Sequence, residues 1–185
     1  MLPPAALRRT LRVLLLAPLA LAAPLLASAP AQAAPQACSN ATAAAAQVSQ
    51  QSVSEAVRCL VNAERAAKRL PALREAPALR RAADAHARDM VVRSYFAHVS
   101  PSGSTLTDRA RRAGYGGFTL GEDIGWGTEE LGTPAAIVDA WMHSPPHRAV
   151  ILHPRFRDIG VGVNLGIPED RSGPGAVYVI DLGRR

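Results

Sequence analysis

The chain has 185 residues, and its 21 Lys and Arg outnumber its 15 Asp and Glu, which gives a formal net charge of +6 at pH 7. Its arginines are scattered and only 4% of its residues are aromatic, whereas nucleic-acid binders typically combine a basic patch with interleaved aromatic residues. We therefore expect no specific nucleic-acid partner.

Residues 1–33 have the pattern of a secretory signal peptide. The segment MLPPAALRRTLR carries three arginines and no acid, an apolar stretch broken by prolines follows, and Ala31–Ala33 fits a small-x-small cleavage site. Cleavage after Ala33 would lower the net charge to +3, because three arginines and no acid are removed. The prolines disfavour the alternative, an uncleaved membrane anchor. We expect a secreted or cell-envelope protein without a membrane span after cleavage.

The two cysteines, Cys38 and Cys59, both follow the predicted cleavage site. An even pair in an exported chain predicts a disulfide, and closing a loop of about 20 residues would stabilise the fold by roughly 3 kcal/mol. Lipid attachment to Cys38 is the alternative, but the preceding residues PQA lack the leucine that a lipobox requires.

After an N-terminal extension at 34–52, we expect one domain over 53–185, which is long enough for a single core. Ser52 and Glu55 form a capping-box pattern and predict a helix from about 53 to 69. A second helix begins at Pro77, with His86 on its apolar face as a core histidine rather than a ligand.

The remaining elements alternate between helix and extended chain. A short helix in LTDRARRAG ends at Gly114, and the glycine-rich 115–127 is expected to be extended and irregular. Thr133 caps a helix over 135–143 that Pro145 and Pro146 terminate. The β-branched runs 159–166 and 176–183 predict an antiparallel hairpin, so the fold class is α+β, or a layered α/β/α domain.

The stretch WMHSPPHRAVILHP contains three of the five histidines. His143 and His147 are four apart, as in zinc-binding helices, but the intervening prolines prevent a continuous helix. His153 is expected to be a loop residue. His147 therefore remains the candidate of this stretch.

Two further segments hold candidate residues. YFAHVSP places His98 beside a turn, and LGEDIGWG places Glu122 and Asp123 among glycines and apolar residues. A carboxylate in such surroundings needs a partner. His98, Glu122 and His147 could form an open metal site, an acid–base site or a hydrogen-bonded polar network, and spacing alone does not show that they meet.

The segments YFAHVSPSG, GYGGFTLGEDIGWG and AIVDAWMHSPPHRAVILHPRFRDIGVGV, with the final strand, resemble the CAP superfamily, which includes cysteine-rich secretory proteins, and its bacterial secreted branch in particular. The resemblance implies an α-β-α sandwich with a small antiparallel sheet and a cleft lined by two histidines and two glutamates. His98, Glu122 and His147 match three of these. The second glutamate falls at Ser144, and Asp123 stands where the family usually has asparagine.

From the residues and the resemblance we expect a monomeric, secreted binding module. Its cleft would take a divalent metal, Zn²⁺ with His98 and His147 as ligands, or a small or lipid-like ligand. One alternative is a metal-dependent peptidase or esterase with Glu122 as base. Another is an envelope or stress interaction protein whose cleft is vestigial.

Overall fold

The computed structural model describes residues 38–168 and 174–185, which belong to one compact unit, Ala34–Arg185. The predicted signal peptide lies outside the described residues. The elements, in chain order, are the 3₁₀ turn η1 (Ala45–Gln47), α1 (Gln50–Ala67), β1 (Arg74–Glu75), α2 (Pro77–Val92), α3 (Leu106–Arg112), β2 (Thr119–Thr128), the 3₁₀ turn η2 (Glu129–Gly132), α4 (Pro134–His143), α5 (Pro145–Ile151), β3 (Asp158–Leu165) and β4 (Gly175–Arg184).

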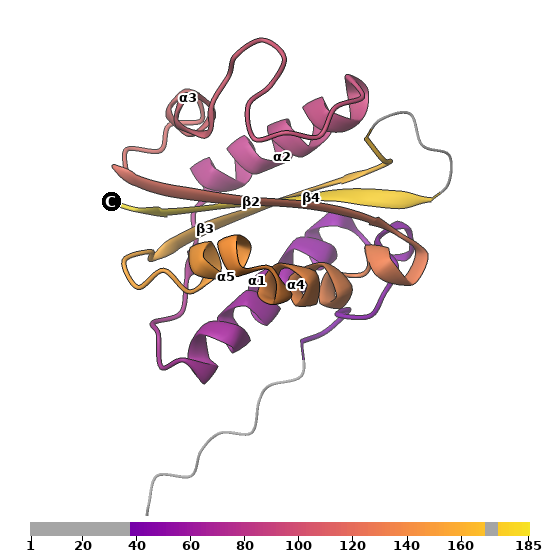
Figure 1. Ribbon diagram of the computed structural model, residues 1–185, viewed down its shortest axis with the longest axis horizontal. Helices are drawn as coiled ribbons and strands as arrows, with labels where there is room; N and C mark the ends of the chain where they lie inside the picture. Colours follow the sequence, from indigo (N-terminus) through magenta and orange to yellow (C-terminus); the bar gives the residue numbers. More distant parts are fainter. Residues whose placement is uncertain (1–37, 169–173) are drawn as a thin grey trace, which may run out of the picture. The chain divides into compact units, whose positions relative to one another are not determined.

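The four strands form one sheet in the order β1-β3-β4-β2 between two layers of helices. Helices α2 and α3 cover one face, and α1, α4 and α5 cover the other (Figure 1). β3 and β4 are antiparallel neighbours, which confirms the predicted hairpin. The predicted α+β class and the α-β-α sandwich are confirmed with it.

The sheet differs from the prediction in two respects. It is mixed rather than purely antiparallel, because the two residues of β1 pair parallel with β3. The glycine-rich segment predicted to be irregular instead contains β2, a regular strand paired with β4 over ten residues. Its glycines make room for neighbouring side chains: a Cβ at Gly121 would lie 2.7 Å from the Phe156 ring, and one at Gly125 would lie 3.1 Å from Trp141.

Alternation along the strands builds a core on each face of the sheet. On β4, Tyr178 and Ile180 pack with Trp141 on the α1, α4 and α5 side, whereas Val177 and Val179 pack with α2. Helix α2 lies very close to β3, since a Cβ at Gly160 or Gly162 would come within 2.2 Å of the α2 backbone. These glycines of the IGVG motif therefore have a packing role.

The N-terminal segment is integrated into the domain more closely than predicted. Helix α1 is capped by Ser49, whose hydroxyl accepts from the Ser52 backbone N–H at 3.1 Å, so the helix begins before the expected capping box. The expected domain boundary at residue 52 consequently falls inside α1. The disulfide between Cys38 and Cys59 confirms the predicted pairing, with a Cα–Cα distance of 5.7 Å.

A fully buried arginine joins α1 to the chain that follows α5. The Arg65 guanidinium donates to the carbonyl oxygens of Pro71, Ile151, His153 and Phe156 at 2.7–3.2 Å. Carbonyl acceptors satisfy its N–H groups, while burial, followed by the charge of Arg157, lowers the pKa of Arg65 from its usual value.

Of the helices in the described segments, none is long and apolar enough to cross a membrane.

Candidate histidine site

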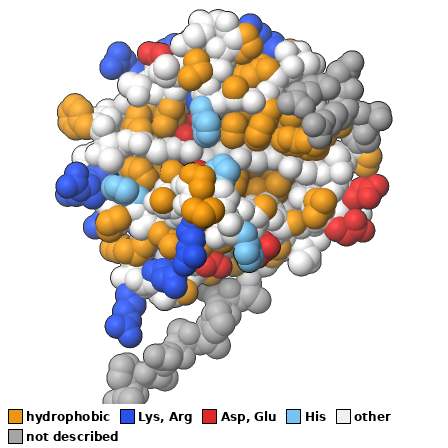
Figure 2. All heavy atoms as spheres, viewed as in Figure 1, with side chains coloured by type: hydrophobic (Ala, Val, Ile, Leu, Met, Phe, Trp, Pro, Cys, Tyr) orange, Lys and Arg blue, Asp and Glu red, His pale blue; other side chains and the backbone are white. Residues whose placement is uncertain are grey.

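The three sequence-predicted residues come from different elements around β2, the strand at one edge of the sheet. Glu122 lies on β2, His98 in the loop between α2 and α3, and His147 on α5 in the opposite layer. Histidine side chains are visible on this face both above and below the position of β2 (Figure 2). We refer to His98, Glu122, Ser144 and His147 as the histidine site.

The structure brings His98 and Glu122 into direct contact. His98 Nδ1 lies 2.8 Å from Glu122 Oε1, and an ionised carboxylate only accepts, so Nδ1 carries the proton. The His98 side chain is 55% exposed and that of Glu122 only 3% exposed. His98 therefore presents its Nε2 edge with its ring orientation determined by a buried carboxylate.

Arg109 on α3 is the second partner of Glu122. Its guanidinium donates to Glu122 Oε2 and, at 3.0 Å, to the carbonyl oxygens of His98 and Ser104. Burial is the largest influence on Glu122 and opposes ionisation, but the His98 hydrogen bond and the Arg109 charge outweigh it and hold the pKa of Glu122 below its usual value. Glu122 is thus a charged residue with both oxygens occupied.

Sequence reasoning missed Arg109. It stands in the run RARR, where nothing in the spacing separates it from Arg111 and Arg112. The one available signal was the buried carboxylate of Glu122, which required a cationic partner from elsewhere in the chain.

A second buried carboxyl, also missed, lies beside Glu122. Asp181 on β4 is the register partner of Glu122 and is fully buried, and neither of its oxygens makes a hydrogen bond of ordinary geometry. Burial first, and then the negative charge of Glu122, raises the pKa of Asp181 well above its usual value. Burial and the neighbouring charge thus both favour the protonated, neutral form of Asp181.

His86 behaves as the sequence analysis expected of a core histidine. It is 1% exposed, and its Nε2 donates to the carbonyl oxygen of Ala97 at 3.1 Å. Nε2 also lies 4.0 Å from Glu122 Oε2. Burial is the main cause of its lowered pKa, so the ring is neutral behind the carboxylate.

His147 approaches from the other layer and is held by Ser144. Its Nδ1 lies 2.8 Å from Ser144 Oγ, at the position where the family resemblance led us to expect a second glutamate. Burial first, and then electrostatic repulsion from the His98 imidazole, lowers the pKa of His147. The two imidazoles are thus close enough to interact electrostatically, with His147 favoured in its neutral form.

The other two histidines of the WMHSPPHRAVILHP stretch lie apart from this arrangement. Ser144 has extended dihedral angles, so α4 ends and α5 begins between His143 and His147. The exposed His143 bonds to the carbonyl oxygen of Asp139 at 2.9 Å, and His153 packs on Phe156 with ring centroids 4.6 Å apart. The spacing of four therefore does not create a shared helical face.

Asp123 points to the opposite side of the sheet from Glu122. It is 1% exposed, and its Oδ2 has no hydrogen-bond partner among the described residues. Burial, followed by the charge of Glu122, raises the pKa of Asp123 to about 8. Burial thus favours the neutral form of Asp123 below about pH 8.

The donor atoms of the site suit a divalent cation in part. Within residues 38–168 and 174–185, no group of three or more His, Cys, Asp or Glu side chains is arranged to hold a metal ion. Because His98 Nδ1 donates to Glu122, the Nε2 atom of His98 has a lone pair for a metal ion, and the Nε2 atom of His147 has one when its Nδ1 donates to Ser144 Oγ. Neutral imidazole nitrogens are ligands that Zn²⁺ favours.

Sequence comparison gives the first relationship to known proteins. A model of the cysteine-rich secretory protein (CAP) family matches residues 59–178. The chain is 40% identical over 103 residues to the uncharacterized protein YkwD of Bacillus subtilis, an alignment that covers 56% of this chain and 39% of YkwD. The chain thus spans about two fifths of the length of this relative.

Solved structures share the fold. An extracellular protein containing an SCP domain from Bacillus anthracis aligns with a TM-score of 0.59 and 26% identity, over 75% of this chain and 44% of that one. An outer surface protein of Borrelia burgdorferi aligns with a TM-score of 0.62 over 75% of this chain and 96% of that one, but at 18% identity it supports the fold alone. Because the family match spans more than half of the chain and includes His98, Glu122 and His147, this protein belongs to the cysteine-rich secretory protein (CAP) family.

Proposed function

We propose that this protein is an exported binding module whose histidine site holds a divalent cation, Zn²⁺ by its donor set, between His98 and His147. The observation that carries the proposal is the hydrogen bond between Glu122 and His98 Nδ1. In metal sites, a carboxylate that accepts from one ring nitrogen orients the imidazole and makes the other nitrogen a better ligand. Arg109 in turn donates a hydrogen bond to Glu122, which fixes the position of the carboxylate that orients His98.

The surroundings of His147 support the same role. A ligand imidazole must be neutral, and the lowered pKa of His147 favours that form at neutral pH. Its contact with Ser144 Oγ at 2.8 Å orients the ring as Glu122 orients His98. Two imidazoles supply two of the four ligands that Zn²⁺ takes, and water or an oxygen atom of a small bound molecule would supply the others.

Export is supported by separate observations. Disulfides persist in oxidising compartments outside the cytosol, and Cys38 and Cys59 form one. The relative at 26% identity is described as an extracellular protein. Both agree with the signal-peptide pattern of residues 1–33.

The alternative of a hydrolase with Glu122 as base is less well supported. A general base needs an accessible lone pair and a pKa near the working pH. Glu122 has both oxygens engaged, by His98 and Arg109, and its pKa is below its usual value. These contacts suit a positioning role better than proton abstraction.

Calorimetric titration with Zn²⁺ tests the proposal. We expect saturable 1:1 binding that weakens by more than about tenfold in the His98→Ala/His147→Ala double variant. The matched control is His143→Ala/His153→Ala, which removes two histidines outside the site and should bind as the unmodified protein does. Equal affinity in both double variants would refute the metal site and favour a cleft without a metal function.

A further inference from the structure

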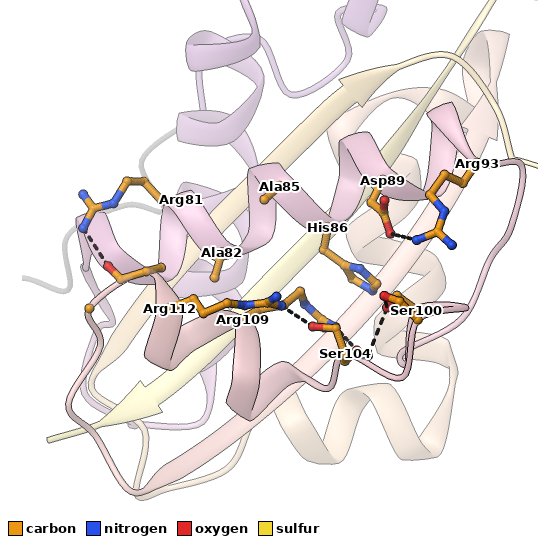
Figure 3. Close-up of a pocket in the computed structure, with 13 residues that line it drawn as sticks. Arg81, Ala82, Ala85, His86, Asp89, Arg93, Ser100, Ser104, Arg109 and Arg112 are labelled. Atoms are coloured by element: carbon orange, nitrogen blue, oxygen red, sulfur yellow. Dashed lines mark hydrogen bonds and ion pairs between the residues drawn. The ribbon is translucent and has the colours of Figure 1, made fainter.

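A cavity of about 710 Å³ lies between α2 and α3, and His98 and Glu122 are not among its lining residues. Figure 3 shows Arg81 at one end, Arg109 and Arg112 beside Ser104 along the middle, and Asp89, Arg93 and Ser100 at the other end. Its volume is within the range of small-molecule binding sites. The remaining lining residues are Ala82, Ala85, His86, Ser102, Ala113 and Gly114.

Two of the four arginines in this cavity already have an anionic partner. Arg93, at the C-terminal end of α2, lies 3.7 Å from Asp89 one turn earlier on the helix. Arg109, 6% exposed, is paired with Glu122 behind the cavity wall. Their charges are therefore largely compensated within the protein.

The other two arginines bond only to neutral oxygen atoms. Arg81 donates to the carbonyl oxygen of Ala113 at 2.8 Å, and Arg112 donates to Ser104 Oγ and, at 3.3 Å, to the carbonyl oxygen of Asp108. The Asp108 carboxylate accepts from the backbone and hydroxyl of Thr105 as a helix cap. Among the described residues, Arg81 and Arg112 make no direct ion pair with a carboxylate, although the charge of Arg112 contributes, after the Thr105 hydrogen bonds, to the lowered pKa of Asp108. Both guanidinium groups can therefore pair with an anionic ligand.

Hydroxyl groups and a carboxylate line the part of the cavity beyond these arginines. Ser100 Oγ lies 2.9 Å from Ser102 Oγ, and Ser104 follows in the same turn. Asp89 adds an acceptor that is already held by Tyr95 and Arg93. Such a set of short hydroxyls and one carboxylate can exchange hydrogen bonds with several ligand hydroxyls.

We propose that this cavity binds a phosphate ester of a sugar or a similar polyhydroxy compound. The phosphate would lie between Arg81 and Arg112, because planar guanidinium groups bind phosphate oxygens in pairs and remain charged at every physiological pH. The hydroxyl-bearing part would extend toward Ser104 and Ser100. The alanines of α2 leave room for its ring.

This site does not depend on the proposed metal function, although the two share a wall. Arg109 and His86 line the cavity and also lie behind Glu122. The phosphate would be bound by Arg81 and Arg112 rather than by these buried groups. The His98→Ala/His147→Ala variant should therefore bind the phosphate ester with unchanged affinity.

Titration with glucose 6-phosphate, inorganic phosphate and glucose, followed by calorimetry and by amide NMR shifts, tests the proposal. We expect glucose 6-phosphate to bind at least about fivefold more tightly than inorganic phosphate, with shifts at Ser100, Ser104 and Ala113, and glucose not to saturate the site. Affinity for inorganic phosphate equal to that for the ester would overturn the proposal.

Matched charge variants separate a specific site from general attraction to a basic protein. Arg81→Gln/Arg112→Gln should weaken glucose 6-phosphate binding by about tenfold or more. Arg88→Gln/Arg111→Gln removes the same charge from exposed positions on the same two helices, outside the cavity lining, and should change affinity by less than about twofold. An equal loss in both double variants would overturn the proposal. Unchanged urea midpoints would show that all four substitutions preserve the fold.

Discussion

Glu122 and Asp181 lie opposite each other on neighbouring strands β2 and β4, yet the pKa values of these two buried carboxyls are shifted in opposite directions, that of Glu122 downward and that of Asp181 upward. The difference follows from their partners. Glu122 receives hydrogen bonds from His98 and Arg109, whereas Asp181 has no hydrogen bond of ordinary geometry and faces the charge of Glu122. Two adjacent carboxylates rarely ionise together in a buried site, so the His98 hydrogen bond and the Arg109 charge favour ionisation of Glu122 over that of Asp181.

We predict that Arg109→Gln destabilises the protein by about 3–5 kcal/mol at pH 7, because it leaves Glu122 buried without its cation. Because the pKa of Glu122 is lower in the folded protein than in the unfolded chain, ionised Glu122 contributes fully to the free energy of unfolding above pH about 4.3, its pKa in the unfolded chain. This contribution is lost as the pH falls through the pKa of Glu122 in the folded protein. The difference between variant and unmodified protein should therefore shrink at acid pH. Urea unfolding at pH 7 and pH 3.5 measures both effects.

The control for Arg109→Gln is Arg111→Gln on the same helix, which is exposed and should change the free energy of unfolding by less than about 0.5 kcal/mol. A loss for Arg109→Gln that does not depend on pH would contradict an electrostatic origin.

We predict that Asp123→Asn stabilises the protein, by roughly 2 kcal/mol or more at pH 7. In the unfolded chain the carboxyl ionises near pH 3.9, whereas in the folded protein burial raises its pKa to about 8. Between these values the folded state binds more protons than the unfolded state, so Asp123 lowers stability progressively as pH rises. Asparagine has nearly the same shape and no such penalty.

Unfolding of Asp123→Asn should accordingly be measured at pH 4, 6 and 8. The gain over the unmodified protein should be small at pH 4 and increase with pH until it levels off above about 8. Asp139→Asn, at an exposed position, is the control and should show no such trend. A gain that is constant across this range would be inconsistent with a buried neutral Asp123.

Much of the fold was predictable because its signals are local. Pro77 and Thr133 mark the starts of α2 and α4, and alternating β-branched residues mark β3 and β4. The regular strand β2 was not predicted, because its glycines read locally as irregular chain. These positions require glycine because of tertiary packing, since side chains such as Phe156 lie directly against the strand.

We predict that Ser144→Ala weakens Zn²⁺ binding by about tenfold while leaving stability nearly unchanged. The Ser144 hydroxyl lies 2.8 Å from His147 Nδ1 and orients the ring, so its loss lets the imidazole rotate away from a bound cation. Calorimetry measures the affinity, and thermal unfolding shows whether the fold is intact. Unchanged affinity in a folded variant would exclude this orienting role.

We predict that Cys38→Ser/Cys59→Ser lowers the free energy of unfolding by about 3 kcal/mol, since it opens a loop with a sequence separation of 21. Denaturant unfolding with and without reductant measures the loss. Reductant should destabilise the unmodified protein to a similar extent and leave the double variant unaffected. A variant that still responds to reductant would show that the effect has another cause.

Only those residues of the candidate site that lie in recognisable sequence segments could be predicted. His98, Glu122 and His147 were identified from their segments, but Arg109 and Asp181 come from a run of arginines and from an apparently ordinary strand. Their importance arises from burial against Glu122, which depends on how β2, β4 and α3 come together. Residues whose role is to set the charge of another residue have no sequence pattern of their own.

The Arg65 guanidinium links α1 to the helix that carries His147 of the histidine site. By binding the carbonyl oxygens of Ile151 and His153, it fastens the C-terminal end of α5 to α1. Helix α5 starts directly after α4, so the short helix that carries His147 is connected to α4 at its N-terminal end and to Arg65 of α1 at its C-terminal end. The position of the helix that carries His147, and hence of the His147 backbone, therefore depends on where α1 packs as well as on α5 itself.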